Sequence, residues 1–248
     1  MCARGFSAQA AWALGHPDKG LAFGCEALAL AELIAHPLSL EDALLWDAIL
    51  HLDRGEPETA QQRLEAAEAL VAEQRLGFIV EPKFIRGAAL AIQGALEEAV
   101  ACLREGLASP LGAMRLRVYG LVRLADALTR QGKYDAALAA AAHGLETQEQ
   151  TGHCQWDAEL HRLEGIALSG LNRLDEGQAA LGEALRVARR QQAKAYELRA
   201  ASSLARLWGE QGRRSEARDL LAPVYGWFTE GFDTADLKDA KALLDELR

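Results

Sequence analysis

The sequence contains few of the residues that build sheets, turns and loops. Of its 248 residues only 6% are aromatic, six are proline and one, Asn172, is asparagine. The shortage of aromatic and β-branched residues argues against a β-sheet protein. No apolar run approaches the roughly 20 residues of a membrane span. Residues 1–6 lack the apolar core of a secretory signal.

Motifs of catalysis and metal binding are also missing. The four cysteines form no CxxC pair and are too sparse for a disulfide framework, so a zinc finger, a redox motif and a secreted scaffold are all disfavoured. The six histidines include no pair four residues apart, and no GxSxG elbow occurs. We therefore expect no catalytic residues, no metal site and no cofactor, that is, a protein that is not an enzyme and that resides in the cytoplasm.

Alanine and leucine together supply more than a third of the chain, while half of all residues are hydrophobic and a quarter are charged. Both residues have high helix propensity, and the composition is too apolar for a disordered chain. The net charge of −9 disfavours nucleic-acid binding through the average field. The composition predicts an all-α protein.

A turn pattern recurs six times along the chain. Each copy opens with Gly, or once with Asn, and three residues later has Asp, Glu or Ser. We call the opening residues anchors: Gly15, Gly55, Gly94, Gly132, Asn172 and Gly212. Their spacing of 38 to 40 residues predicts an array of helix–turn–helix repeats.

The residue types at each turn have a physical reason. Gly, and next best Asn, adopts the left-handed backbone that ends a helix. Pro17 and Pro57 suit a first helical turn, where a missing N–H costs nothing. Asp135, Asp175 and Ser215 are expected to be N-caps of the helices that follow the last three anchors.

Small residues recur at fixed distances from the anchors. Seventeen of the eighteen residues that lie seven before, five after and twelve after an anchor are Gly or Ala. These columns are Ala8, Ala48, Gly87, Ala125, Gly165 and Ala205; Gly20, Ala60, Ala99, Ala137, Gly177 and Ala217; Ala27, Ala67, Gly106, Gly144, Ala184 and the exception Val224. Side chains this small let helices approach closely, so the columns predict where helices cross.

The segment 132–138, with Ala125 before it and Gly144 after it, resembles a tetratricopeptide (TPR) repeat. This resemblance implies a right-handed α-α superhelix in which the first helix of each pair lines a concave surface. Nearly the whole chain also resembles the C-terminal helical-repeat region of bacterial regulatory ATPases, in which a class III nucleotide cyclase or a DNA-binding domain precedes an NTPase module. The most similar part is 189–233. This second resemblance implies a fragment, or a stand-alone relative, of a longer protein.

The expected architecture is a TPR-like solenoid. Residues 1–233 form about six repeats of roughly forty residues, with anchors near 15, 55, 94, 132, 172 and 212. Residues 234–248 form a capping helix that begins after Thr234, with its acidic residues, including Asp236 and Asp239, facing water. We expect the aromatic residues of 225–232 to seal the last repeat, although a ligand site there is an alternative.

Binding residues are expected on the first helices. With TPR geometry, the residues thirteen, ten and six before each anchor face inward, and in the second half of the chain these positions carry polar side chains. The candidates are Tyr119, Asp126, Glu159, Arg162, Arg199 and Arg206. Exposed Arg and Tyr side chains are typical anchors of protein recognition. The alternative is that these residues are solvated and pair with one another.

The charge distribution limits the partners. Residues 181–218 carry a net charge of +5 within an otherwise acidic chain. This block suits an acidic peptide, a phosphorylated ligand or an acidic part of a second copy. The hypothesis is a non-catalytic protein-interaction or regulatory module, the sensor or scaffold part of a larger signalling ATPase or transcriptional regulator. Its partner is a protein, a peptide or a neighbouring domain, with no membrane. The alternative is a domain that senses a small-molecule inducer in the groove.

Overall fold

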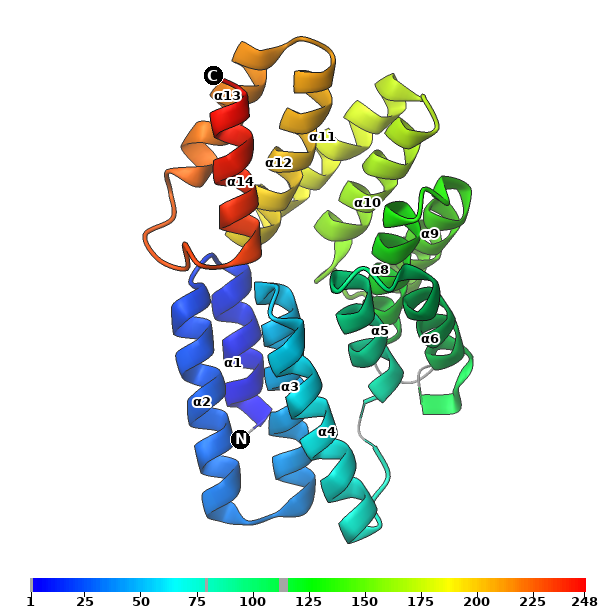
Figure 1. Ribbon diagram of the computed structural model, residues 1–248, viewed down its shortest axis with the longest axis vertical. Helices are drawn as coiled ribbons and strands as arrows, with labels where there is room; N and C mark the ends of the chain where they lie inside the picture. The colour runs from blue at the N-terminus through cyan, green and yellow to red at the C-terminus, as the bar shows by residue number, and fades with distance from the viewer. Residues whose placement is uncertain (1, 79, 112–115) are drawn as a thin grey trace. The chain divides into compact units, whose positions relative to one another are not determined.

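The computed structural model describes residues 2–78, 80–111 and 116–248, and every regular element within these ranges is a helix (Figure 1). The thirteen described α-helices are α1 Cys2–Ala13, α2 Pro17–Ile34, α3 Pro37–Arg54, α4 Pro57–Gln74, α5 Pro82–Ile92, α6 Leu96–Ala108, α8 Arg117–Arg130, α9 Tyr134–Thr151, α10 Asp157–Gly170, α11 Leu174–Arg190, α12 Lys194–Glu210, α13 Arg214–Tyr225 and α14 Ala235–Glu246. The predicted all-α class is confirmed. No helix in the described part of the chain has the length and the apolar character needed to cross a bilayer.

The anchors lie where the sequence placed them, between the two helices of a pair. All six have the left-handed backbone, with φ from 62° at Asn172 to 90° at Gly15. The pairs are α1–α2, α3–α4, α5–α6, α8–α9, α10–α11 and α12–α13, and α14 follows them. Six helix–turn–helix repeats and a C-terminal helix are therefore present.

The predicted N-caps after the last three anchors are wrong. Helices α9, α11 and α13 begin two residues earlier than expected, so Asp135, Asp175 and Ser215 lie in the first turn. The reason is that each turn closes on the backbone alone: the N–H of Lys133, directly after its anchor, donates to the carbonyl of Leu128 at 2.9 Å. The carboxylates of the first turn still interact favourably with the helix dipole. Pro17 and Pro57 do open their helices, as expected.

Glycines of the first two small-residue columns lie where the helices of a pair cross. A methyl group on Gly165 of α10 would lie 2.9 Å from the carbonyl oxygen of Gly177 on α11. The same group on Gly20 of α2 would lie 2.9 Å from the carbonyl oxygen of Ala8 on α1. Real side-chain carbons do not approach backbone oxygens this closely, so Gly holds the two helices at this separation. The prediction from the columns is confirmed at these crossings.

The chain divides into two compact units. The N-terminal unit is Met1–Trp12 with His16–Leu124, and the C-terminal unit is Ala13–Gly15 with Ala125–Arg248. The N-terminal unit has its own apolar core, in which Leu45, Phe84 and Ile85 are fully buried. Helix α8 contributes residues to both units.

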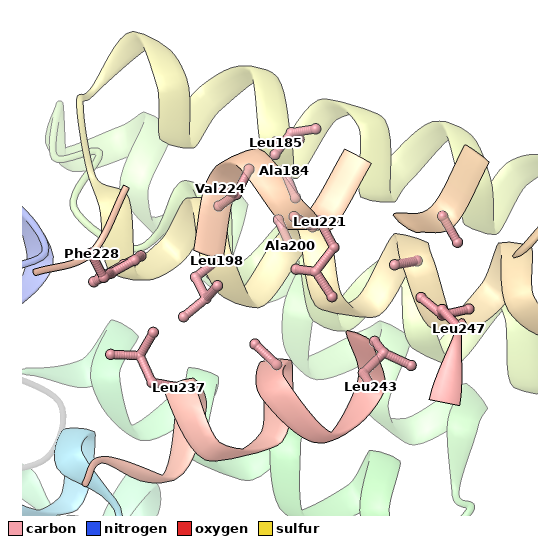
Figure 2. Packing of buried hydrophobic residues seen from close by; sticks show 14 residues of the cluster. Ala184, Leu185, Leu198, Ala200, Leu221, Val224, Phe228, Leu237, Leu243 and Leu247 are labelled. Carbon is pink, nitrogen blue, oxygen red and sulfur yellow. The ribbon is translucent and has the colours of Figure 1, made fainter. Parts of the chain in front are cut away.

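The core of the C-terminal unit includes the last helix (Figure 2). Apolar side chains of α14 pack against α12 and α13 in a cluster that contains Leu198, Leu221, Val224, Leu237, Ala240, Leu243 and Leu247. Phe228 joins this cluster and is buried, whereas Trp227 and Phe232 are 40% and 49% exposed. Helix α14 thus covers the last repeat. Of these three aromatic residues, only Phe228 is buried between this helix and the repeat.

Candidate functional site

Five of the six candidate residues belong to first helices of the C-terminal unit. Asp126 lies on α8, Glu159 and Arg162 lie on α10, and Arg199 and Arg206 lie on α12. Residues three apart share one face of a helix, and residues seven apart do so two turns away. Each first helix therefore presents its charged candidates on one side.

Arg162 of α10 contacts side chains of its own helix and of two other helices, α8 and α12. Its Nε and Nη2 donate to the two carboxylate oxygens of Glu159 at 2.9 and 2.7 Å. Nη2 also lies 3.9 Å from Oδ1 of Asp126 on α8, and Nη1 donates to the hydroxyl of Ser203 on α12 at 3.4 Å. One guanidinium therefore links α8, α10 and α12.

Arg199 extends this network to the last helix. Its Nη1 lies 3.6 Å from Oε1 of Glu159, and its Nε donates to Oδ2 of Asp236 on α14 at 2.8 Å. Asp126, Arg162, Glu159, Arg199 and Asp236 therefore alternate in sign across α8, α10, α12 and α14. We call these five residues the charge row.

Burial and pairing shift the pKa values of the row. Burial opposes the positive charge of Arg162, but the Glu159 carboxylate outweighs it and raises the pKa of Arg162. Burial raises the pKa of Asp236, and the nearby Arg199 offsets this only in part. The side chains of Arg162 and Arg199 are 13% and 14% exposed. The middle of the row is thus a largely desolvated ionic network.

Arg206 forms a separate pair that is open to solvent. Its Nη2 lies 2.7 Å from both carboxylate oxygens of Asp239, one helical turn along α14 from Asp236. The side chains of Arg206 and Asp239 are 45% and 54% exposed. Among the candidate residues, Arg206 therefore offers the guanidinium that a partner reaches most easily.

Tyr119 lies in a different environment. It belongs to the N-terminal unit, its side chain is 2% exposed, and the guanidinium of Arg123 lies 4.7 Å from its ring centre. Tyr119 is therefore a buried residue of the N-terminal unit, and it is not part of the charge row.

Asp236 and Asp239 are not among the predicted candidates, because the helical pattern of 234–248 predicts that both face the solvent. The structure corrects this for Asp236, which is paired and about a quarter exposed. A signal was present: Asp236 follows Arg199 by 37 residues, close to one repeat, as Arg199 follows Glu159 by 40. Continuing the period beyond the last anchor identifies α14 as the next first helix.

A second polar cluster lies in the N-terminal unit, where α3 meets α4. His51 is hydrogen-bonded to Glu56 through Nδ1, and its Nε2 lies 3.5 Å from Oδ2 of Asp47, which also accepts from Nε of Arg63 at 2.7 Å. Burial opposes a charge on His51, but the two carboxylates outweigh it and raise its pKa. Within the described ranges, no three His, Cys, Asp or Glu side chains are grouped to hold a metal ion. The cluster joins two helices.

The fold resembles that of known helical-repeat proteins. No protein-family model and no curated protein matches the chain. Among solved structures, NprR in complex with its cognate peptide NprX has a TM-score of 0.64 at 16% identity, over 91% of this chain and 65% of NprR. The fold is a TPR-like helical repeat. A STAND-type signal transduction ATPase from Pyrococcus horikoshii with a TPR sensor has a TM-score of 0.54 at 18% identity, over 84% of this chain and 32% of that protein.

The chain therefore spans 65% of NprR and about a third of the STAND protein. At these identities the likeness establishes the fold and leaves the function to be argued from the residues.

Proposed function

We propose that this chain is a non-catalytic interaction module that binds a peptide or protein segment beside the charge row, on the side where Arg206 is exposed. The observation that carries the proposal is the alternating row on successive first helices, which ends next to the open Arg206–Asp239 pair. Arginine is among the residues that contribute most to protein recognition. NprR, which shares the fold, binds a peptide.

We also propose that the module is the sensor or scaffold part of a larger signalling ATPase or transcriptional regulator in the cytoplasm. A STAND ATPase with a TPR sensor shares the fold over a third of its length, which supports this context. The mechanism is a population shift: a partner stabilises one arrangement of the repeats, and the attached domain responds to that arrangement. No bond is made or broken.

The experiment is a selection of binding peptides. A random twelve-residue peptide library is panned on the immobilised chain, and enriched peptides are measured by calorimetry against the wild type and Arg206→Glu. We expect binding to weaken at least about tenfold, because the reversed charge repels what the guanidinium attracted. The matched control is Arg186→Glu, an exposed arginine of α11 that pairs with Glu183.

Equal loss in Arg206→Glu and Arg186→Glu would assign the effect to net charge and contradict the proposed surface. Arg199→Glu serves as a second variant, which also places a negative charge between Glu159 and Asp236. Its result is interpreted only where circular dichroism confirms the wild-type helix content.

The alternative ligand is a small-molecule inducer, which would make this chain a sensor, a role that the name of the STAND protein gives to its own TPR region. A bound metabolite stabilises the fold by mass action, by about 2.7 kcal/mol at a hundred times its Kd. Thermal shift across a metabolite and nucleotide collection distinguishes the two. A clear shift with one compound, together with no enriched peptide, would replace the peptide proposal by the inducer proposal.

A further inference from the structure

Both arginines of α12 contact a carboxylate of the last helix of the same chain, and Arg199 also contacts Glu159 of α10. Arg199 donates to Asp236, and Arg206 donates to both oxygens of Asp239. Asp236 and Asp239 are one turn apart on α14, whereas Arg199 and Arg206 are two turns apart on α12. Helix α14 thus presents acidic side chains to the surface that the proposed function assigns to a partner.

The exposed Arg206–Asp239 pair is not what holds α14 in place. Leu237, Ala240, Leu243 and Leu247, all at most 6% exposed, lie in the core of the C-terminal unit, and the helical period places Asp236 on the same face as the last three of them. Apolar burial on this scale outweighs an exposed ion pair, which contributes little to stability. The position of α14 is therefore set mainly by its apolar side chains. In this position Asp236 accepts a hydrogen bond from Arg199, and Asp239 accepts from Arg206, so both arginines of α12 are already paired.

The geometry also indicates which chemistry the arginines accept. A guanidinium and a carboxylate form charge-assisted hydrogen bonds, and both oxygens of Asp239 accept from Nη2 of Arg206 while the Asp239 side chain stays 54% exposed. A carboxylate from solution can therefore exchange with that of Asp239 without opening the core. The basic block at 181–218, with a net charge of +5, attracts the same kind of partner.

We propose that the surface around Arg199 and Arg206 binds an acidic peptide segment, and that Asp236 and Asp239 of α14 are intramolecular competitors for it. The inference rests on the proposed function and specifies the chemistry of the partner. Helix α14 then covers the last repeat and also makes the surface selective. A peptide segment needs more than one carboxylate to displace two aspartates, so weakly acidic segments are excluded.

The test measures the anisotropy of a fluorescein-labelled peptide of ten glutamates with the full chain. In Asp236→Asn/Asp239→Asn the two arginines lose the carboxylates of α14, while Arg199 keeps Glu159, and we expect at least about fivefold tighter binding than in the wild type. The matched control, Asp245→Asn/Glu246→Gln, removes the same charge from exposed positions of the same helix. We expect its affinity to stay within about twofold of the wild type.

Three results would overturn the inference: equal affinities of wild type and Asp236→Asn/Asp239→Asn, an equal gain in the control, or a gain that persists when Arg206→Ala is added. A single-stranded DNA of matched charge is a fourth arm, and an equal gain there would show a general polyanion site. The single variant Asp239→Asn, at an exposed position, replaces the double variant if the latter fails to fold.

The outcome is separable from that of the proposed function. If library peptides bind the wild type through Arg206 but the aspartate variants show no gain, only the competitor role fails. If no library peptide binds wild type or variant, the interaction surface itself is wrong.

Discussion

The two units use equivalent positions of their first helices for different purposes. In the N-terminal unit, the positions ten and six before an anchor carry Leu45, Ile49 and Phe84, all buried. In the C-terminal unit, the same positions include Arg162 and Arg206. The helix crossings are set by Gly and Ala in both units, so the inner positions are free to differ. A repeat scaffold can thus change from an apolar core to an ionic surface without a change of fold.

The units also differ in where their ionic networks lie. In the N-terminal unit, His51, Asp47 and Arg63 tie α3 to α4, and Arg54 donates to the carbonyl of Pro17 on α2 at 2.9 Å. In the C-terminal unit, the charge row runs across first helices and ends beside an exposed pair. The network of the N-terminal unit ties helices that follow one another in the chain together, while the network of the C-terminal unit links first helices of several pairs and lies next to a solvent-exposed ion pair.

The sharpest test of the apolar side of this comparison is Phe84→Ala. Phe84 is fully buried in the N-terminal unit, and Gly106 of α6 and Gly120 of α8 have no side chain to fill the space that it would leave. We expect a loss of about 3–5 kcal/mol in the free energy of unfolding, from lost transfer energy and the cavity. Urea unfolding followed by circular dichroism measures it, and a loss below about 1 kcal/mol would contradict the assigned core.

Arg162 tests the ionic side. Arg162→Ala removes the two hydrogen bonds that the buried Glu159 accepts from Arg162, while Arg199 stays 3.6 Å away, so we expect a loss of about 2–3 kcal/mol by the same urea assay. The double variant Glu159→Leu/Arg162→Met converts the position to the apolar kind found in the N-terminal unit. Replacing both partners of a buried pair is often neutral, so it should unfold within about 1 kcal/mol of the wild type. A double variant as unstable as Arg162→Ala would show that the charges themselves are required.

Much of the fold was predictable because its determinants are local and periodic. Left-handed turns favour Gly or Asn, and close crossings need small residues, so Asn172 and Gly165 could be interpreted without a structure. The N-caps were not predictable in this way, since the turn closes through the backbone N–H of the residue after the anchor. The hydrogen bonds of that turn are not encoded in any side chain.

The site was predictable only in part. Glu159 and Arg162 are three apart on one helix, so their pairing follows from the sequence. Tyr119 occupies the same repeat position as Glu159, and both are buried, but only Glu159 joins the ionic network, because the period does not specify which side chains surround each position. Asp236 pairs with Arg199 across two helices, a contact that becomes visible only when the period is continued into a segment with no anchor of its own.

The ionic network of the N-terminal unit predicts a pH dependence. Because the pKa of His51 is raised in the folded state, its stabilising contribution is complete below the ordinary histidine pKa of about 6.5 and is lost as the pH rises through the raised value. We expect the free energy of unfolding to fall by on the order of 1 kcal/mol between about pH 6 and about pH 9.

His51→Gln should lack this decrease, whereas His143→Gln, at an exposed position of α9, should keep it. Asp47 acts in the opposite direction: its pKa is lowered, because the hydrogen bonds from His51 and Arg63 outweigh its burial, so its contribution is lost as the pH falls. The same decrease above pH 6 in His51→Gln would place its origin elsewhere.

The smallest effect on stability is expected at the exposed end of the comparison. Arg206→Ala and Asp239→Asn each break a pair whose side chains are 45% and 54% exposed, and we expect changes within about 0.5 kcal/mol in urea unfolding. A loss above about 1.5 kcal/mol would make the pair a structural element. A pair that is exposed and weakly stabilising, set at the end of a buried row, can exchange one carboxylate for another at little cost to the folded state.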